Sequence, residues 1–387
     1  MRLRLVLVSG FVLATLAGCG DAGGSRRNPD PESVPAAWER LPDPPLSRRS
    51  SPVVAWTGTE LLVIGGDTSA PCPPGADCVG PDHHARDGAA YRPDEKTWRA
   101  ITPAPADIPP GTQSAQVGGR LYLLAGQTLL EYDVAGDTWS RPTTPQLAWS
   151  WLVADGSRLL FVSGSDEQGV RPDRVYDPAA DRWSVLPDDP IGPAYDRNIT
   201  ATSHGLVLTA KELVDNPGGG DRPSLVLAAV LEDGTWRRLP DSDQLGGWRW
   251  AWTGARLVDP TLGGSDGGGD GAGDYGRWFP NGGILDPATG TWSRLPNAPK
   301  ERTGGWPVET LGGPAIAAEG WLFDERDESW TRVPSPSDAP EQPGPAVWVG
   351  DRLVVVGGVH EDRGDTVDAL SPRVWIWSSA LTTGKNL

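Results

Sequence analysis

The sequence predicts an all-β fold built from repeated antiparallel hairpins, and three observations support this prediction. Residues 175–187 (VYDPAADRWSVLP) return almost unchanged at 284–296 (ILDPATGTWSRLP). Runs of four to six apolar residues alternate with turn residues, in a chain that holds 50 Gly and 39 Pro among 387 residues. After the first 20 residues we find no helical apolar period, and short apolar runs between Gly and Pro are typical of strands.

The start of the chain predicts export and a lipid anchor. Arg2 and Arg4 precede an apolar run at 5–17, which is too short to span a bilayer and suits a secretory signal peptide. The run ends in Leu-Ala-Gly-Cys, which resembles the bacterial lipobox. This resemblance implies that residues 1–18 are cleaved and that Cys19 receives a diacylglycerol thioether. An ordinary signal peptide with an incidental cysteine is the alternative.

The predicted anchor divides the chain into three parts. Residues 1–18 are the expected signal peptide, residues 19–33 a polar tether, and residues 34–387 the folded domain. We expect the protein to be held by lipid at the outer face of the bacterial cytoplasmic membrane. Two or more acyl chains give a stable anchor.

Each predicted unit of the folded domain opens with a hairpin. The clearest one lies at 51–66, where apolar runs at 53–56 and 61–64 flank Thr-Gly-Thr-Glu and are followed by two glycines. A similar pattern recurs at 346–358 near the end of the chain. Gly-centred links between apolar runs indicate tight hairpin turns.

Each unit ends with a strand that carries a tryptophan. In the repeated segment an apolar run ends in Asp-Pro, where Asp can bond its own backbone two residues on and Pro presets φ for a turn. The chain then reverses and places a Trp that one hairpin cannot bury. We therefore expect neighbouring units to pack against these indoles.

Hairpin, Gly-Gly, variable loop, Tyr-Asp-Pro and Trp together resemble the kelch repeat, over about residues 34–377. The resemblance implies four-stranded antiparallel blades arranged as a β-propeller, as in the central domain of galactose oxidase. Seven Trp residues at spacings of 38 to 60 predict seven blades, with six or eight as the alternative. These residues are Trp38, Trp98, Trp139, Trp183, Trp236, Trp292 and Trp330.

The two ends of the chain are expected to complete one blade together. Trp38 has no strands before it, and residues 345–377 supply three strands with no repeat Trp after them. Residues 37–41 therefore predict the outer strand of the last blade, which closes the ring and removes an open edge. The Gly pair is intact only at 65–66 and 357–358. The prediction of the middle blades therefore depends mainly on the Trp spacing.

The charge of the chain excludes two classes of partner. The formal net charge is −17, and loss of Arg2 and Arg4 with the leader lowers it to −19 (−17 − 2). Such a surface repels nucleic acid and anionic headgroups. We expect no nucleic-acid partner, contact with the membrane only through the anchor, and a monomer.

Cys72 and Cys78 predict a disulfide in the long loop of the first blade. Cysteines this close in an exported protein most often pair. The alternative is a zinc site completed by His83 or His84, but the spacing fits no common zinc finger.

No cofactor is predicted. Asp266, Asp270 and Asp274 recur in a Gly-rich loop at 263–276, yet the loop lacks the alternating spacing and closing Glu of a calcium loop. A flexible acidic loop is the preferred interpretation. Some kelch proteins resemble galactose oxidase in using copper held by Tyr and His; only four His are present here, which disfavours such a site.

The kelch resemblance also implies where a ligand would bind. The first strand of a blade is innermost, so its start lies at one mouth of the central channel. Arg with aromatic walls at that mouth suits an anionic or sugar ligand. The alternative is structural: Trp packs between blades and Arg pairs with Asp. The residues in these positions are Arg48, Arg49, Trp149, Trp151, Arg197, Trp248, Trp250 and Arg302.

Two functions follow as hypotheses. The first is a lipid-anchored binding module that presents its mouth to an extracellular protein, peptide or glycan. The second is a carbohydrate-active enzyme of the sugar mutarotase or oxidase type, with Asp67, Asp166 or His360 as the acid or base. A scaffold alone does not decide between them. Convergence of one of these groups with the mouth arginines would favour the enzyme.

Overall fold

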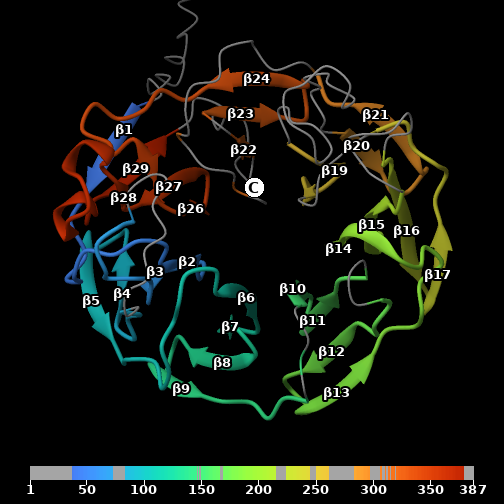
Figure 1. The fold of residues 1–387 in the computed structure, drawn as a ribbon, viewed down its shortest axis with the longest axis horizontal. Coiled ribbons are helices and arrows are strands. Elements are labelled where there is room, and N and C mark those ends of the chain that lie inside the picture. The colour runs from blue at the N-terminus through green and yellow to red at the C-terminus, as the bar shows by residue number, and fades with distance from the viewer. Residues whose placement is uncertain are drawn as a thin grey trace, which may run out of the picture.

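The computed structural model shows a ring of antiparallel sheets around a central axis (Figure 1). It describes residues 37–72, 83–145, 147, 150–165, 169–214, 224–244, 250–260, 283–296, 306, 310, 313, 315–318 and 320–378. The sheets form seven blades, which confirms the predicted fold and blade number.

The first four blades each have four strands in sequence order. Blade 1 contains β2 (Val53–Trp56), β3 (Leu61–Ile64), β4 (Gly88–Arg92) and β5 (Thr97–Ile101). Blade 2 contains β6 (Gln113–Val117), β7 (Arg120–Ala125), β8 (Thr128–Asp133) and β9 (Thr138–Ser140). Blade 3 contains β10 (Ser150–Asp155), β11 (Arg158–Ser163), β12 (Arg174–Asp177) and β13 (Arg182–Val185). Blade 4 contains β14 (Ala194–Thr202), β15 (Gly205–Glu212), β16 (Val226–Glu232) and β17 (Thr235–Arg238).

The next two blades keep this order although they lack the Gly pair. Blade 5 contains β18 (Ala251–Trp252), β19 (Leu257–Val258), β20 (Gly283–Asp286) and β21 (Thr291–Arg294). Blade 6 contains β22 (Ile316–Ala318), β23 (Trp321–Asp324) and β24 (Ser329–Arg332). In blade 6 a single bridge between Thr310 and Ala317 occupies the place of the innermost strand.

Blade 7 is shared by the two ends of the described chain. Its order is β26 (Ala346–Val349), β27 (Arg352–Val356), β29 (Val374–Ser378) and then β1 (Ala37–Leu41). Trp38 of β1 lies opposite Trp377 of β29, and their rings are 5.4 Å apart. The predicted closure of the ring is confirmed.

The hydrophobic core consists of separate layers between neighbouring blades. Leu62 and Ile64 of blade 1, for example, pack with Leu121 and Leu123 of blade 2. Equivalent clusters join all the remaining pairs of neighbouring blades, including blades 7 and 1. Each blade is therefore stabilised by burial of apolar surface on both of its faces.

The seven predicted Trp residues make one repeated contact. Each indole Nε1–H donates to a backbone carbonyl in the segment that follows the outer strand of the preceding blade, at 2.5 to 3.0 Å. Trp98 of blade 1, for instance, donates to Pro42 after β1, and Trp38 of blade 7 donates to Pro334 after β24. The Trp residues thus join neighbouring blades by hydrogen bonds as well as by packing.

The turn before each Trp follows from the sequence of the repeat. Asp177 Oδ1 accepts from the backbone N–H groups of Ala179 and Ala180, and Asp286 Oδ1 does the same for Ala288 and Thr289. These bonds confirm the predicted Asp-based turn.

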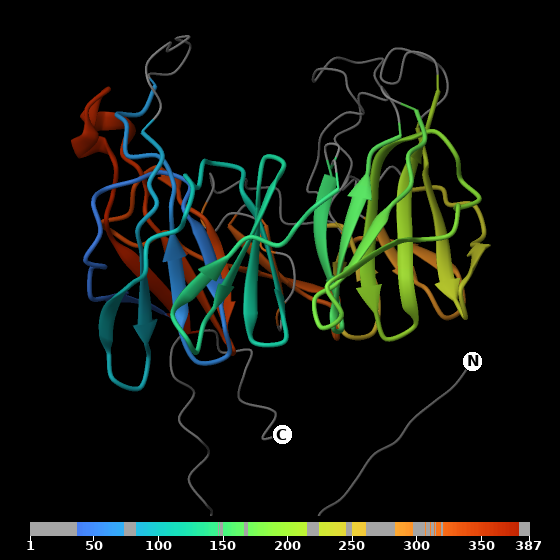
Figure 2. The same cartoon turned by 90° about the horizontal axis from the view of Figure 1, so that it is seen from below.

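The two faces of the ring differ in their connections (Figure 2). Short hairpins such as 57–60 join first to second strands on one face, which we call the hairpin face. Second strands connect to third strands on the other face, which we call the loop face; in blade 7 this connection runs from 357 to 373, whereas in blade 2 it is a two-residue turn at 126–127. On the loop face blade 7 carries a short ribbon of β25 (Gln342–Pro343) and β28 (Gly358–Val359), and two 3-10 turns, η1 (Glu361–Arg363) and η2 (Val367–Ala369). Among the described residues, no helix has the length and apolar character needed to cross a membrane.

Candidate functional site

The described members of the predicted mouth lie at the loop face, where first strands begin and second strands end. Backbone bridges join Asp67, which follows β3, to Ser50 before β2 and to His84 before β4. Trp149, Trp248 and Arg302 fall outside the described residues, as do Asp166 and the acidic loop positions Asp266, Asp270 and Asp274.

Arg49 is buried and ion-paired within blade 1. Its guanidinium donates to both oxygens of Asp87, at 2.8 and 3.1 Å, and to the carbonyl of Gly65 at 3.1 Å. Ser47 accepts from it through its hydroxyl and its carbonyl. Each donor of this guanidinium is therefore bonded within the blade.

Arg197 makes the same arrangement between blades 3 and 4. It donates to both oxygens of Asp173, at 2.8 and 2.6 Å, and to the carbonyl of Ser163 at 2.9 Å. Asp189 accepts a further bond at 2.9 Å, and all three charged side chains are at most 5% exposed. Nearby acids raise the pKa of Arg197 although its burial acts in the opposite direction. A buried pair of this kind becomes costly when one partner is lost.

Both arginines thus use a carboxylate that immediately precedes a third strand. Asp87 comes before β4, and Asp173 comes before β12. These contacts support the structural alternative for Arg49 and Arg197, whereas a role in ligand binding stays a prediction. An Asp directly before the third strand of a blade is the sequence feature that these two partners share, although the sequence alone did not pair it with an Arg.

The other described mouth residues divide between core and surface. Trp250 is 2% exposed, belongs to the core between blades 4 and 5, and meets Trp292 edge-on at 5.8 Å. Trp151, on the innermost strand β10, is 45% exposed. Arg48 donates to the carbonyl of Leu370 at 2.7 Å and lies 3.8 Å from Asp368. Trp151 and Arg48 are therefore the mouth residues that the structure leaves at least partly accessible.

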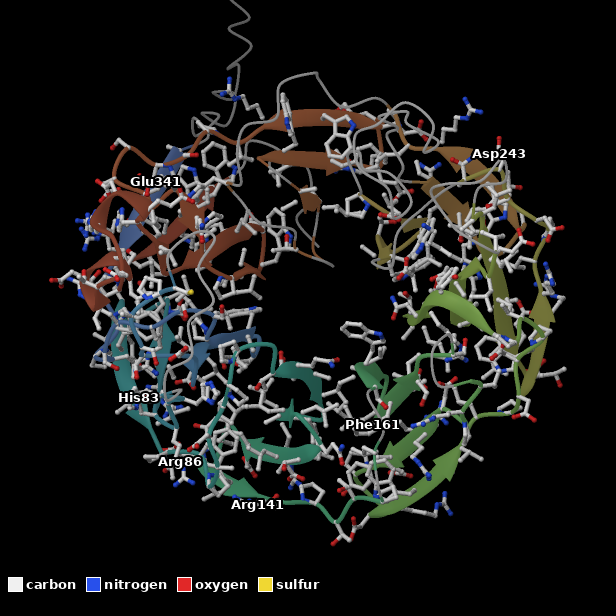
Figure 3. All side chains as sticks on the ribbon, in the orientation of Figure 1. His83, Arg86, Arg141, Phe161, Asp243 and Glu341 are labelled. Atoms are coloured by element: carbon white, nitrogen blue, oxygen red, sulfur yellow. The ribbon has the colours of Figure 1, made fainter. Side chains whose placement is uncertain are left out.

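His360 lies in a second group on the loop face, together with Glu341 and Asp362. One ligand atom from each side chain lies within 4.8 Å of the others. The β25–β28 ribbon brings them together, because Gln342 pairs with Val359 and so sets Glu341 beside His360. Glu341 Oε2 accepts the backbone N–H of Glu361 at 3.0 Å. Figure 3 shows Glu341 at the outer rim of the ring, away from its centre.

Glycines make this ribbon possible. Gly358 has φ of 128°, and a Cβ there would lie 2.4 Å from the carbonyl oxygen of Gln342. At Gly344 a Cβ would lie 1.9 Å from the carbonyl oxygen of Val356. The intact Gly pair at 357–358 was the sequence signal for this close approach.

Burial lowers the pKa of His360, with Arg363 acting in the same direction. Its imidazole is therefore held neutral at neutral pH. Glu341 Oε2 lies 3.9 Å from His360 Nδ1, which is beyond hydrogen-bond distance.

A polar cleft of about 610 Å³ opens at the hairpin ends of blades 1 and 2. Glu60, Arg92, Arg99, Gln116 and Asp137 are among the residues that line it. Glu60 is buried and accepts from Arg99 at 2.7 and 3.0 Å and from Arg92 at 2.8 Å. These bonds lower the pKa of Glu60, and the bond from Arg99 has the largest effect. Sequence reasoning missed this cleft, because its groups come from turns of two different blades.

Only one cysteine of the predicted disulfide is among the described residues. Cys72 is described and Cys78 is not, so their pairing stays a prediction. His83 and His84, the zinc alternative, continue the chain after the undescribed segment; the backbone N–H of His83 bonds Ser69 Oγ at 3.2 Å.

The ring of seven antiparallel blades places this chain in the β-propeller class, which includes binding modules, interaction modules and enzymes. No protein-family model matches the chain, and no curated protein matches it. Among the solved structures with some likeness is one described as "Structure of YjhT". It is 15% identical, has a TM-score of 0.41, and the match covers 63% of this chain and 83% of that chain. At this level of similarity nothing is carried over from YjhT to this chain.

Proposed function

We propose that this protein is a lipid-anchored, extracytoplasmic propeller of the kelch type that binds a protein, peptide or glycan through its loop face. The observation that carries the proposal is the direction in which β1 runs at the outer edge of blade 7. Ala37 pairs with Ser378, and Ser378 pairs with Arg352 at the hairpin turn between β26 and β27. The chain therefore enters the fold at the hairpin face.

An anchor at Cys19 would favour one orientation of the ring while leaving it free to tilt. Ala37 lies eighteen residues after Cys19 (37 − 19), and a loose chain of that length spans about 23 Å on average. The hairpin face would then lie close to the membrane and the loop face would point outward. The polar cleft at the hairpin ends would be the less accessible of the two candidate regions.

The loop face also carries the chemistry of a binding surface. An exposed Trp on an innermost strand supplies a flat apolar surface with a polar N–H, which suits a sugar ring or a peptide. Long loops on a rigid ring allow the surface to vary without loss of the fold. Because the donors of Arg49 and Arg197 are bonded to carboxylates and carbonyls of the fold, we place the ligand contact on Trp151 and the surrounding loops instead of on these two arginines.

The anchor is tested with the Cys19→Ala variant of the full chain. We expect this variant in the culture medium and the unchanged protein in the membrane fraction. A Cys72→Ala, Cys78→Ala double variant is the matched control and should stay with the membrane. Retention of Cys19→Ala in the membrane would contradict the anchor.

Binding is tested with the released Cys19→Ala protein on glycan and peptide arrays. Trp151→Ala, on the loop face, should weaken the strongest signal at least about 10-fold, as expected for loss of an aromatic anchor. Arg158→Ala, at the hairpin face of the same blade, should leave it unchanged. Equal loss in both variants, or a loss only with Arg158→Ala, would contradict binding at the loop face.

A further inference from the structure

We propose that Glu341, His360 and Asp362 form a binding site for one divalent transition-metal ion, with Zn²⁺ as the best fit. The site lies on the rim of blade 7, next to the β25–β28 ribbon. It is separate from the Cys72 loop that the sequence suggested for zinc, and it does not depend on the proposed binding function.

The spacing of the three side chains fits a metal ion. Their ligand atoms all lie within 4.8 Å of one another, and His360 Nδ1 is 3.9 Å from Glu341 Oε2. Tetrahedral zinc with bonds of about 2.0–2.1 Å holds its ligand atoms about 3.4 Å apart. Small rotations of two surface carboxylates would close the remaining difference.

His360 supplies an independent observation. Its side chain is only 8% exposed, and within the described chain its ring nitrogens make no hydrogen bond. The ring nitrogens are not among the fully buried unpaired atoms of the described chain, so solvent reaches them. Nδ1 faces the Glu341 carboxylate at 3.9 Å, which is too long for a hydrogen bond, and a metal ion between them would bind both groups.

The backbone around the site is held in place. The N–H of His360 donates to the carbonyl of Ala369 at 2.8 Å, and the bond from Glu361 N–H fixes the Glu341 carboxylate. Gln342 Nε2 in turn donates to Glu361 at 2.8 Å. The ligands therefore come from two segments that the ribbon already joins. Metal binding would cost little conformational entropy as a result.

The ligand types select the class of ion. One imidazole nitrogen and two carboxylates suit zinc and similar first-row ions, whereas calcium needs six to eight oxygens. Two carboxylate charges match a divalent ion. Arg363, 3.9 Å from Asp362, is the nearest competing cation and would have to turn toward solvent.

The test is Zn²⁺ binding to the released Cys19→Ala protein, measured by competition with a chromogenic chelator and by thermal unfolding. We expect one Zn²⁺ per chain and a rise in melting temperature with Zn²⁺ concentration. His360→Gln should weaken binding by more than about 100-fold, above the loss seen when outer-shell partners are removed. His83→Gln, an exposed histidine in the same histidine-poor chain, is the matched control and should bind as the parent does.

Glu341 is exposed, so Glu341→Gln should fold as the parent does. If His360→Gln does not fold, Glu341→Gln provides the same test. This variant should also lose most of the affinity and the thermal shift. A Cys72→Ser, Cys78→Ser double variant should keep both. Parent-like binding in Glu341→Gln or His360→Gln, binding lost only in the cysteine variant, or no Zn²⁺ binding by the parent would each overturn the proposal.

Discussion

The conformation of single residues decides how each outer strand begins. In six blades the residue two places before the repeat Trp has a positive φ: Lys96, Asp137, Asp181, Gly234, Gly290 and Glu328. In blade 4 the preceding residue Asp233 has a positive φ as well, so that Asp233 and Gly234 make a two-residue turn. Gly and Asp tolerate this region, while Lys and Glu occupy it at a cost.

We therefore predict that Lys96→Asn stabilises the protein. Asn adopts the left-handed region more readily, so the free energy of unfolding should rise by about 0.5–1 kcal/mol. Lys96→Val, with a branched Cβ, should lower it. Urea unfolding of the two variants measures both, and a lower stability for the Asn variant would contradict the strain argument.

Glu60 gives a second prediction, on pH. Its folded-state pKa is lowered, chiefly by the bonds from Arg99, so its carboxylate stabilises the fold at pH values above the unfolded pKa of about 4.5. That contribution is lost as the pH falls from there through the folded pKa. We expect the parent to lose stability on acidification from pH 5 to pH 3.

The matched variant for this test is Glu60→Gln, which cannot ionise. It should be less stable than the parent at pH 7, and the difference between the two should shrink as the pH falls toward 3. Denaturant unfolding across this pH range measures the difference, and a gap that stays constant with pH would contradict the role of the charge.

At the scale of elements, the outer strand of each blade is the contact to the previous blade. Trp139 of β9 packs against Tyr132, with ring centroids 4.8 Å apart, and donates to Thr102, which follows β5 of blade 1. Tyr91 and Trp98 in blade 1, and Tyr176 and Trp183 in blade 3, repeat the ring contact. An indole can make both contacts, because its ring packs within its own blade and its N–H reaches the preceding blade.

We predict that Trp139→Phe costs about 1 kcal/mol of unfolding free energy. The ring contact with Tyr132 is kept and only the hydrogen bond to Thr102 is lost, which sets the size of the effect. Trp139→Ala, which also removes the ring, should cost about 3 kcal/mol. Thermal or urea unfolding separates the two, and equal stabilities of parent and Phe variant would show that the bond contributes nothing.

Much of this element-level order is readable from the sequence, because it is local. Asp-Pro turns and the pairing of Tyr176 with Trp183 lie within about ten residues, and their repetition allowed the blades to be counted. The partners of Arg49 and Arg197 and the group around His360 were not readable. Asp87 is 38 residues from Arg49, and Glu341 reaches His360 only through a ribbon of two short strands. Their contacts depend on how loops of different length fold over the blades.

At the scale of the whole molecule, the ring is closed by β1. Trp38 meets Trp377 at 5.4 Å and Trp306 at 5.6 Å, and its N–H donates to Pro334 in blade 6. Removal of this strand would leave β29 with an unpaired edge, which favours association of chains.

We predict that Trp38→Ala lowers the free energy of unfolding by about 2–3 kcal/mol, somewhat below the range for a fully buried Trp. Deletion of residues 37–41 should have a larger effect and should shift the protein toward dimers or aggregates in light scattering. Trp330→Ala in blade 6 is the control, since it weakens one blade contact without opening the ring. A deletion variant that stays monomeric and as stable as the parent would contradict closure by β1.

The pairing of Ala37 with Ser378 has a consequence for engineering the chain. Opposed residues of antiparallel strands lie about 5 Å apart, so a linker of a few residues could join these two positions directly. New ends could then be cut into any connection on the loop face. Such a circular permutant would keep every pair of neighbouring strands in the ring. Its N-terminus, and any membrane anchor fused to it, would lie on the loop face instead of the hairpin face.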